Sequence, residues 1–125
     1  MTMASNTTLT LHRLKKIEII VHAEDQRPVE DLLHAAGIGG WTMIRDVAGL
    51  GHGGFHQGRS IFNDQTGLVM FVGVADAATI ERAARGLARL FETRAGVTFL
   101  SEVEVMRSGY FAPGTADGAA PVERI

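Results

Sequence analysis

The order of the hydrophobic patterns along this chain constrains its fold more than any other feature of the sequence. Segments with the two-residue period of a strand alternate with segments that have the spacing of an amphipathic helix. The order is strand, helix, strand, a long glycine-rich stretch without apolar periodicity, and then strand, helix, strand. The predicted strands span residues 14–23, 41–48, 68–75 and 97–106, and the predicted helices span residues 26–36 and 77–91.

Local signals mark the ends and the apolar faces of these elements. Asp25 and Asp76 stand where a side-chain oxygen can cap a helix, and Gly37 stands where a left-handed residue can end one. The apolar stripe predicted on the second helix comprises Ile80, Ala84, Leu87 and Phe91, and the apolar face predicted on the second strand comprises Trp41, Met43 and Val47.

Right-handed crossovers would arrange this order as a ferredoxin-like βαββαβ fold of the α+β class, a four-stranded antiparallel sheet with both helices on one face. The long loop between the second and third strands covers about residues 49–67, and loops of that length are usually functional or disordered. The third strand, residues 68–75, is apolar without interruption, so we expect it to be covered on both faces. Because two helices cover only one face, further copies of the chain are expected on the other.

Length and composition limit what the chain can do. Its 125 residues fit one domain, predicted over residues 13–110, between a flexible N-terminus (1–12) and a mobile C-terminal tail (111–125). The absence of cysteine excludes disulfides, thiolate metal sites and cysteine nucleophiles, and it suits a cytoplasmic protein. A net charge of −2 provides no general basic footprint for nucleic acid, and no apolar run is long enough for insertion into a membrane.

A glycine-rich segment follows the second strand, at residues 49–54. Such a segment serves either as a flexible loop base or as an anion cradle, in which backbone N–H groups approach a phosphate closely. Neither a Walker A order nor a following helix is present, which excludes a P-loop and a dinucleotide fingerprint. Arg59, Arg94 and Arg107 are the candidates for the countercharge, since a guanidinium–phosphate pair contributes about 1.5–3 kcal/mol.

Two histidines in the loop suggest a different class of function. His52 and His56 stand four residues apart and could share a metal ion if the loop were helical. The surrounding glycines oppose a helix, and no thiol or nearby carboxylate completes a ligand set. A homo-oligomer of the same fold that binds or senses a metal ion through these two histidines is nevertheless the alternative function. No serine or carboxylate pair stands in a catalytic arrangement, so we do not expect an enzyme.

Several short motifs resemble those of PII signal-transduction proteins. The chain shares the opening of the first strand at residues 15–20 and the Gly-x-Gly base of a long loop at residues 49–51. The triplet at residues 40–42 and the segment at residues 101–106 resemble more closely the PII-like regulators that are linked to bicarbonate transport and carboxysomes. The resemblance covers residues 14–110.

The resemblance implies a homotrimer with an adenine nucleotide in each cleft between subunits, and a long T-loop that changes order with the ligand and docks partner proteins. By position, Gly49 and Gly51 match the glycines that approach the nucleotide, and Arg107 matches a phosphate-contacting arginine. The other candidates for the nucleotide site are Ile20 near the adenine, Gly96 in the turn before the last strand, Arg59 and Arg94 for their charge, and Trp41 and Thr42 as contacts to the base.

Departures from the PII pattern refine this implication. The loop from Gly51 to Thr66 has no tyrosine, so uridylylation is not expected. Residues 92–96 lack the Gly-Lys sequence that favours a triphosphate, so the resemblance implies ADP or AMP as the ligand. The glycines and histidines of residues 52–59 fit the carboxysome-associated branch, which implies bicarbonate as a second ligand and a bicarbonate transporter or carboxysome-linked protein as the partner. The expected function is control of inorganic-carbon uptake or fixation.

Overall fold

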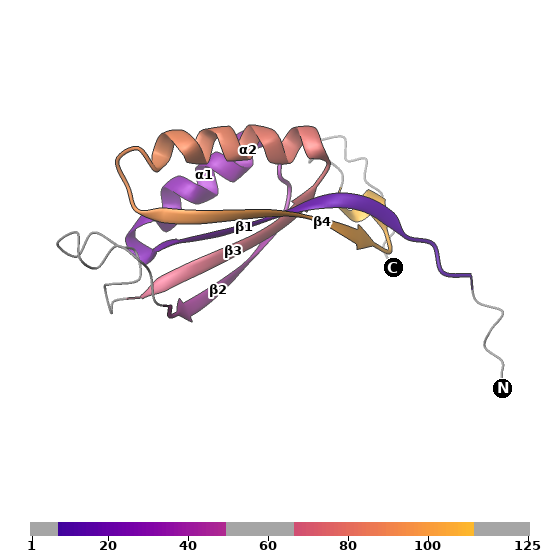
Figure 1. Ribbon diagram of the computed structural model, residues 1–125, viewed down its shortest axis with the longest axis horizontal. Helices are drawn as coiled ribbons and strands as arrows, with labels where there is room; N and C mark the ends of the chain where they lie inside the picture. The colour runs from indigo at the N-terminus through magenta and orange to yellow at the C-terminus, as the bar shows by residue number, and fades with distance from the viewer. Residues whose placement is uncertain (1–7, 50–66, 112–125) are drawn as a thin grey trace.

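A computed structural model describes residues 8–49 and 67–111 of the chain. Its elements follow the predicted order, with two short 3₁₀ helices in addition (Figure 1). They are β1 (His12–His22), η2 (Ala23–Asp25), α1 (Gln26–Ala36), β2 (Trp41–Val47), β3 (Leu68–Ala75), α2 (Ala77–Leu90), β4 (Gly96–Val105) and η5 (Ser108–Phe111).

The four strands form one sheet in the order β2-β3-β1-β4, and each neighbouring pair is antiparallel. Both helices lie on the same face of this sheet (Figure 1). The predicted ferredoxin-like fold is therefore confirmed. Within residues 8–49 and 67–111, no helix is both long and apolar enough to cross a membrane.

The main core lies between the sheet and the two helices. Ile17, Ile19 and Val21 alternate along β1 and are fully buried on this face, beside Phe71 of β3. The helices contribute Val29 and Leu33 from α1, and Ile80, Ala83 and Leu87 from α2. Burial of each large apolar side chain stabilises the fold by about 1.5–3 kcal/mol. Ala83 takes the core position that the sequence pattern assigns to Ala84, which is partly exposed.

The ends of the helices follow two of the three predicted signals. Gly37 has a φ of 98° and ends α1 in the left-handed conformation, as predicted. Asp76 caps α2, because its side chain accepts a hydrogen bond from the Thr79 N–H at 2.8 Å. Asp25 does not cap α1 with its side chain. The 3₁₀ turn of η2 leaves Asp25 outside the extended conformation of a capping residue, and its carboxylate instead contacts Arg94.

The predicted apolar face of β2 is wrong at one residue. Trp41 and Met43 lie on the helix side of the sheet, opposite Gly73 and Phe71. Asp46 has a φ of 59° and forms a bulge, so the register shifts before Val47. Val47 therefore pairs with Leu68 and lies on the other face of the sheet.

The face of the sheet without helices, called here the open face, carries many apolar side chains. A small cluster of Ile20 and Leu68, with Val47 and Ala95 packed against it, covers one end. Further along the same face, Ile44 is 44% exposed and Phe99 is 53% exposed. An apolar sheet face of this kind is typical of an interface with another chain.

Candidate ligand site

One group of the predicted site residues gathers where β2 ends and β3 begins, called here the loop end of the sheet (Figure 1). Gly49 lies two residues beyond β2, and Gly96 pairs with Val21 at the start of β4. Ile20 is buried in the small cluster on the open face. The Ala23 N–H donates to the Gly67 carbonyl at 3.0 Å, which joins the end of β1 to the start of β3. The ends of β1 and β2 and the starts of β3 and β4 thus all lie at this end of the sheet.

Arg94 belongs to the same end and is held by an ion pair. Its Nε donates to Asp25 Oδ1 at 2.9 Å, and its Nη2 donates to the same oxygen. Asp25 is only 2% exposed, whereas the Arg94 side chain is 46% exposed. The hydrogen bond and the charge of Asp25 raise the pKa of Arg94 further above its ordinary value. The guanidinium therefore stays charged and has one edge fixed to the protein.

Gly96 has a steric reason to be glycine. A Cβ at this position would overlap the ring of Phe91, which packs on the main core. The absence of a side chain lets the turn between α2 and β4 close over the ring.

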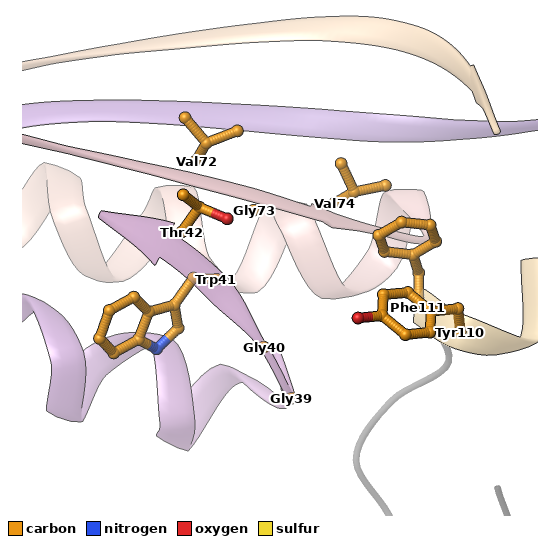
Figure 2. Close-up of a pocket in the computed structure, with 9 residues that line it drawn as sticks. All are labelled: Gly39, Gly40, Trp41, Thr42, Val72, Gly73, Val74, Tyr110 and Phe111. Atoms are coloured by element: carbon orange, nitrogen blue, oxygen red, sulfur yellow. The ribbon is translucent and has the colours of Figure 1, made fainter. Parts of the chain in front are cut away.

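A second group lies where β2 begins and β4 ends, called here the cavity end. A cavity of about 410 Å³ opens there beside the edge strand β2 (Figure 2). Thr42, Val72 and Val74 belong to the open face and line it, with Tyr110 and Phe111 of η5 on the other side. Its remaining lining residues are Gly39, Gly40, Trp41 and Gly73. The walls of the cavity are apolar and polar in about equal parts, which suits a flat, partly apolar ligand such as a nucleobase.

Trp41 and Thr42 have different surroundings, although both were predicted to contact a base. The Trp41 ring packs edge-on against Phe71, with 5.1 Å between the ring centroids, and the residue is 38% exposed. In Figure 2 the Trp41 ring points away from Val72 and Val74, whereas Thr42 lies close to Val72. The ring of Trp41 is thus mainly a support of the edge strand, and Thr42 is better placed for a ligand in the cavity.

Arg107 follows β4 at the cavity end. Its guanidinium carbon lies 5.6 Å from the centroid of the Tyr110 ring, and the Tyr110 N–H donates to the Arg107 carbonyl at 3.2 Å. Tyr110 is 73% exposed and stands edge-on to Phe111. The structure therefore adds this aromatic pair to the candidate site. The sequence pattern assigns Phe111 to the tail, although two aromatic residues just after a candidate arginine are a visible signal.

The two groups lie at opposite ends of the same sheet. Gly96 and Val105 are the first and last residues of β4, nine steps apart. At a rise of about 3.4 Å per residue, the loop end and Arg107 are separated by roughly 30 Å along the strand. One small ligand cannot reach both groups within a single chain. A site that uses Gly49 and Arg107 together must form between two copies.

The other candidates lie in a segment that the structure does not describe. Gly51, Arg59, His52 and His56 are all outside residues 8–49 and 67–111. In those described ranges, no three histidine or carboxylate side chains gather as a metal site would require. No observation in the described part of the chain favours the alternative of a metal-binding protein.

The fold defines a class of small α+β protein, and in this chain the candidate site residues are divided between the two ends of the sheet. Comparison with known families identifies the class further. The profile of the family "Nitrogen regulatory protein P-II" matches residues 14–110. The chain therefore belongs to the PII family, as its motifs had indicated, and like other PII signalling proteins it is a non-enzymatic regulator.

Solved structures support this assignment. CPII from Thiomonas intermedia K12, bound to ADP, AMP and acetate, is 28% identical with a TM-score of 0.73, and the match covers 83% of this chain and 99% of CPII. The same protein bound to ADP, AMP and bicarbonate is 29% identical with a TM-score of 0.71, over 84% of this chain and 99% of CPII. A PII-like signalling protein from Thermus thermophilus shares the fold at 19% identity and a TM-score of 0.61, over 82% of this chain and 99% of that protein. No curated protein sequence matches the chain.

Proposed function

We propose that this protein is a cytoplasmic PII-like regulator that binds ADP or AMP between its subunits, with bicarbonate as a second ligand. Its output would be control of inorganic-carbon uptake or fixation. The observation that carries the proposal is the division of the candidate site between the two ends of the sheet. Such a division is useful only if neighbouring copies bring opposite ends together. The CPII structures, which contain ADP, AMP and bicarbonate, support these ligands.

The open face supports a homotrimer. PII proteins are typically trimeric, and here an apolar sheet face with Ile44 and Phe99 exposed is available for association. Packing of the open faces around a common axis would bury these side chains and place the loop end of one chain beside the cavity end of the next. Both the apolar face and the divided candidate site support the proposed assembly.

Each end would supply a different part of the nucleotide site. At the cavity end, Thr42, Val72 and Val74 would enclose the base, and Tyr110 would offer a ring for stacking. At the loop end, the backbone of Gly49 and Gly96 and the side chain of Arg94 would face the phosphates or the bicarbonate. Arg107 would come from the cavity end as a second countercharge. Micromolar affinity, about −8 kcal/mol, is the expected scale.

Regulation would follow from linkage between the ligand and the loop that begins at Gly49. A ligand that makes different contacts in two loop states shifts their populations by that difference in free energy. A bicarbonate transporter or a carboxysome-linked protein would then read the state of the loop. This partner is proposed from the resemblance to the carbon-linked branch and from the bicarbonate in the CPII structures.

Isothermal titration of the purified protein with AMP, ADP and ATP, each with and without bicarbonate, tests the proposal. We expect micromolar binding of ADP and AMP that tightens when bicarbonate is present. Binding that is indifferent to bicarbonate would remove the carbon signal and keep the nucleotide regulator. If no nucleotide binds under any condition, the proposed function is wrong.

A further inference from the structure

The ion pair between Asp25 and Arg94 links two distant parts of the chain, 69 positions apart in sequence. Asp25 ends η2 just before α1, and Arg94 lies in the turn between α2 and β4. A carboxylate that is 2% exposed needs a partner, since an unpaired buried charge is strongly unfavourable. The pair therefore fixes the position of both groups at the loop end of the sheet.

The geometry of the pair leaves part of the guanidinium free. A guanidinium has five N–H donors in a planar fork. The bonds to Asp25 use the edge formed by Nε and Nη2, and both reach the same oxygen, Oδ1. The donors of Nη1 and the second N–H of Nη2 lie on the other edge, which faces away from Asp25. The Arg94 side chain as a whole is 46% exposed, which is compatible with access of a ligand to this second edge.

We propose that Asp25 is a positioning residue for oxyanion binding. It orients Arg94 so that the free edge of the guanidinium receives a phosphate of the nucleotide or the bicarbonate, two anions that present the same pair of oxygen acceptors. The proposal rests on the proposed function and assigns a role to a carboxylate that the family motifs did not single out. It also explains how an acidic side chain can belong to an anion site: Asp25 is buried behind the guanidinium and meets the ligand only through it.

Four variants test this role: Asp25→Asn, Arg94→Lys, Arg94→Ala and the double variant Asp25→Asn/Arg94→Ala. Asparagine keeps the shape and one acceptor but loses the charge that orients the fork. Lysine keeps the charge but loses the second edge. The matched control is the exposed pair of Arg85 and Glu81 on α2, changed to Arg85→Ala and Glu81→Gln. Thermal unfolding of each ligand-free protein reports the purely structural effect of each change.

Titration with ADP, AMP, adenosine and bicarbonate gives the decisive readout. We expect Asp25→Asn and Arg94→Lys each to weaken ADP binding about tenfold, the effect of one charge-assisted hydrogen bond, with adenosine unaffected. The double variant should bind ADP no more weakly than Arg94→Ala alone, because Asp25 acts only through Arg94. A loss that occurs only with bicarbonate present would assign the free edge to bicarbonate; a loss without it would assign the edge to phosphate.

Two results would overturn the positioning role. One is unchanged ADP and bicarbonate affinity in Asp25→Asn and in Arg94→Lys. The other is an equal loss for adenosine and ADP, which a general structural defect would produce. Failure of the proposed function looks different, because the wild-type protein would then bind no nucleotide at all. In that case the same variants titrated with inorganic phosphate and bicarbonate decide whether Arg94 receives an oxyanion.

Discussion

The two ends of the sheet carry the two halves of the candidate site, and they are built in different ways. At the loop end, Asp25 and Ile20 are buried, Arg94 is fixed by an ion pair, and Gly96 closes over Phe91. At the cavity end, Tyr110 is 73% exposed, meets Phe111 of η5 edge-on and lies beside the guanidinium of Arg107. The loop end therefore holds a charged guanidinium in place by contacts within one chain. The cavity end instead exposes an aromatic ring that a second chain or a ligand would cover.

The largest effect is expected from a change that prevents association, so that the loop end of one chain cannot meet the cavity end of another. Ile44→Glu or Phe99→Glu places a carboxylate on the open face, where association would bury it without a partner. We expect monomers by light scattering after size exclusion, together with a loss of nucleotide affinity of at least about a hundredfold. Arg85→Glu, on the helix side, is the control and should leave the trimer intact. Monomers that bind ADP as tightly as the wild type would refute the divided site.

A large effect on stability is expected at the loop end. Gly96→Ala forces a methyl group against the ring of Phe91 and should lower the free energy of unfolding by about 1–3 kcal/mol. Urea unfolding at a fixed protein concentration measures the loss. The double variant Gly96→Ala/Phe91→Leu removes the obstructing ring and should recover part of it. Gly109→Ala is the matched control at the cavity end, because nothing lies within 4 Å of a Cβ at that position. Equal losses at both glycines would show that the two ends do not differ in packing.

A moderate effect on binding, with none on folding, is expected at the cavity end. Tyr110→Ala removes the exposed ring beside the cavity and should weaken ADP binding about tenfold, since stacking of a base on an aromatic side chain contributes about 1–3 kcal/mol. Tyr110→Phe keeps the ring and should keep the affinity. Isothermal titration with ADP, together with the melting temperature of each ligand-free variant, separates the two effects. Unchanged ADP affinity in Tyr110→Ala would remove this residue from the site.

The smallest effect concerns the carboxylate that begins α2 at the cavity end. Hydrogen bonds from Thr79 lower the pKa of Asp76 in the folded protein. In the pH range around and below 3.8, the unfolded chain thus binds more protons at this position, so stability rises with pH. The contribution of Asp76 is present above its ordinary pKa and is lost as the pH falls through the lower, folded pKa. Asp76→Ala should cost about 1 kcal/mol at pH 7, and Asp76→Asn clearly less. A cost for Asp76→Ala that is independent of pH would contradict this.

Much of the fold could be predicted from the sequence because its signals are local. The two-residue period of a strand and the period of a helix are visible within a few residues. Gly37 and Asp76 likewise mark a helix end and a helix start within one turn. The bulge at Asp46 was not predicted, because aspartate adopts the left-handed conformation only occasionally and a single aspartate within a strand pattern does not mark a bulge. Its consequence, the reversal of Val47 to the open face, was missed for the same reason.

The candidate site was predictable only in part, for a physical reason. Motifs indicated Ile20, Gly49, Gly96 and Arg107 as candidates, but their distribution over the two ends of the sheet depends on strand register. The pair of Asp25 and Arg94 joins residues far apart in sequence, and a helix cap was the better local interpretation of Asp25. Tyr110 is placed by η5, a short 3₁₀ helix that leaves no periodic pattern.

Mixed trimers test the central claim, that each ligand site uses the loop end of one chain and the cavity end of another. Arg94→Ala impairs the loop end and Arg107→Ala impairs the cavity end, so each variant alone should bind ADP weakly. When the two are denatured, mixed in equal amounts and refolded together, about a quarter of the clefts should combine an intact loop end with an intact cavity end and regain wild-type affinity for ADP. If both halves of the site came from the same chain, mixing would restore no tight binding, and the claim of a site shared between chains would be wrong.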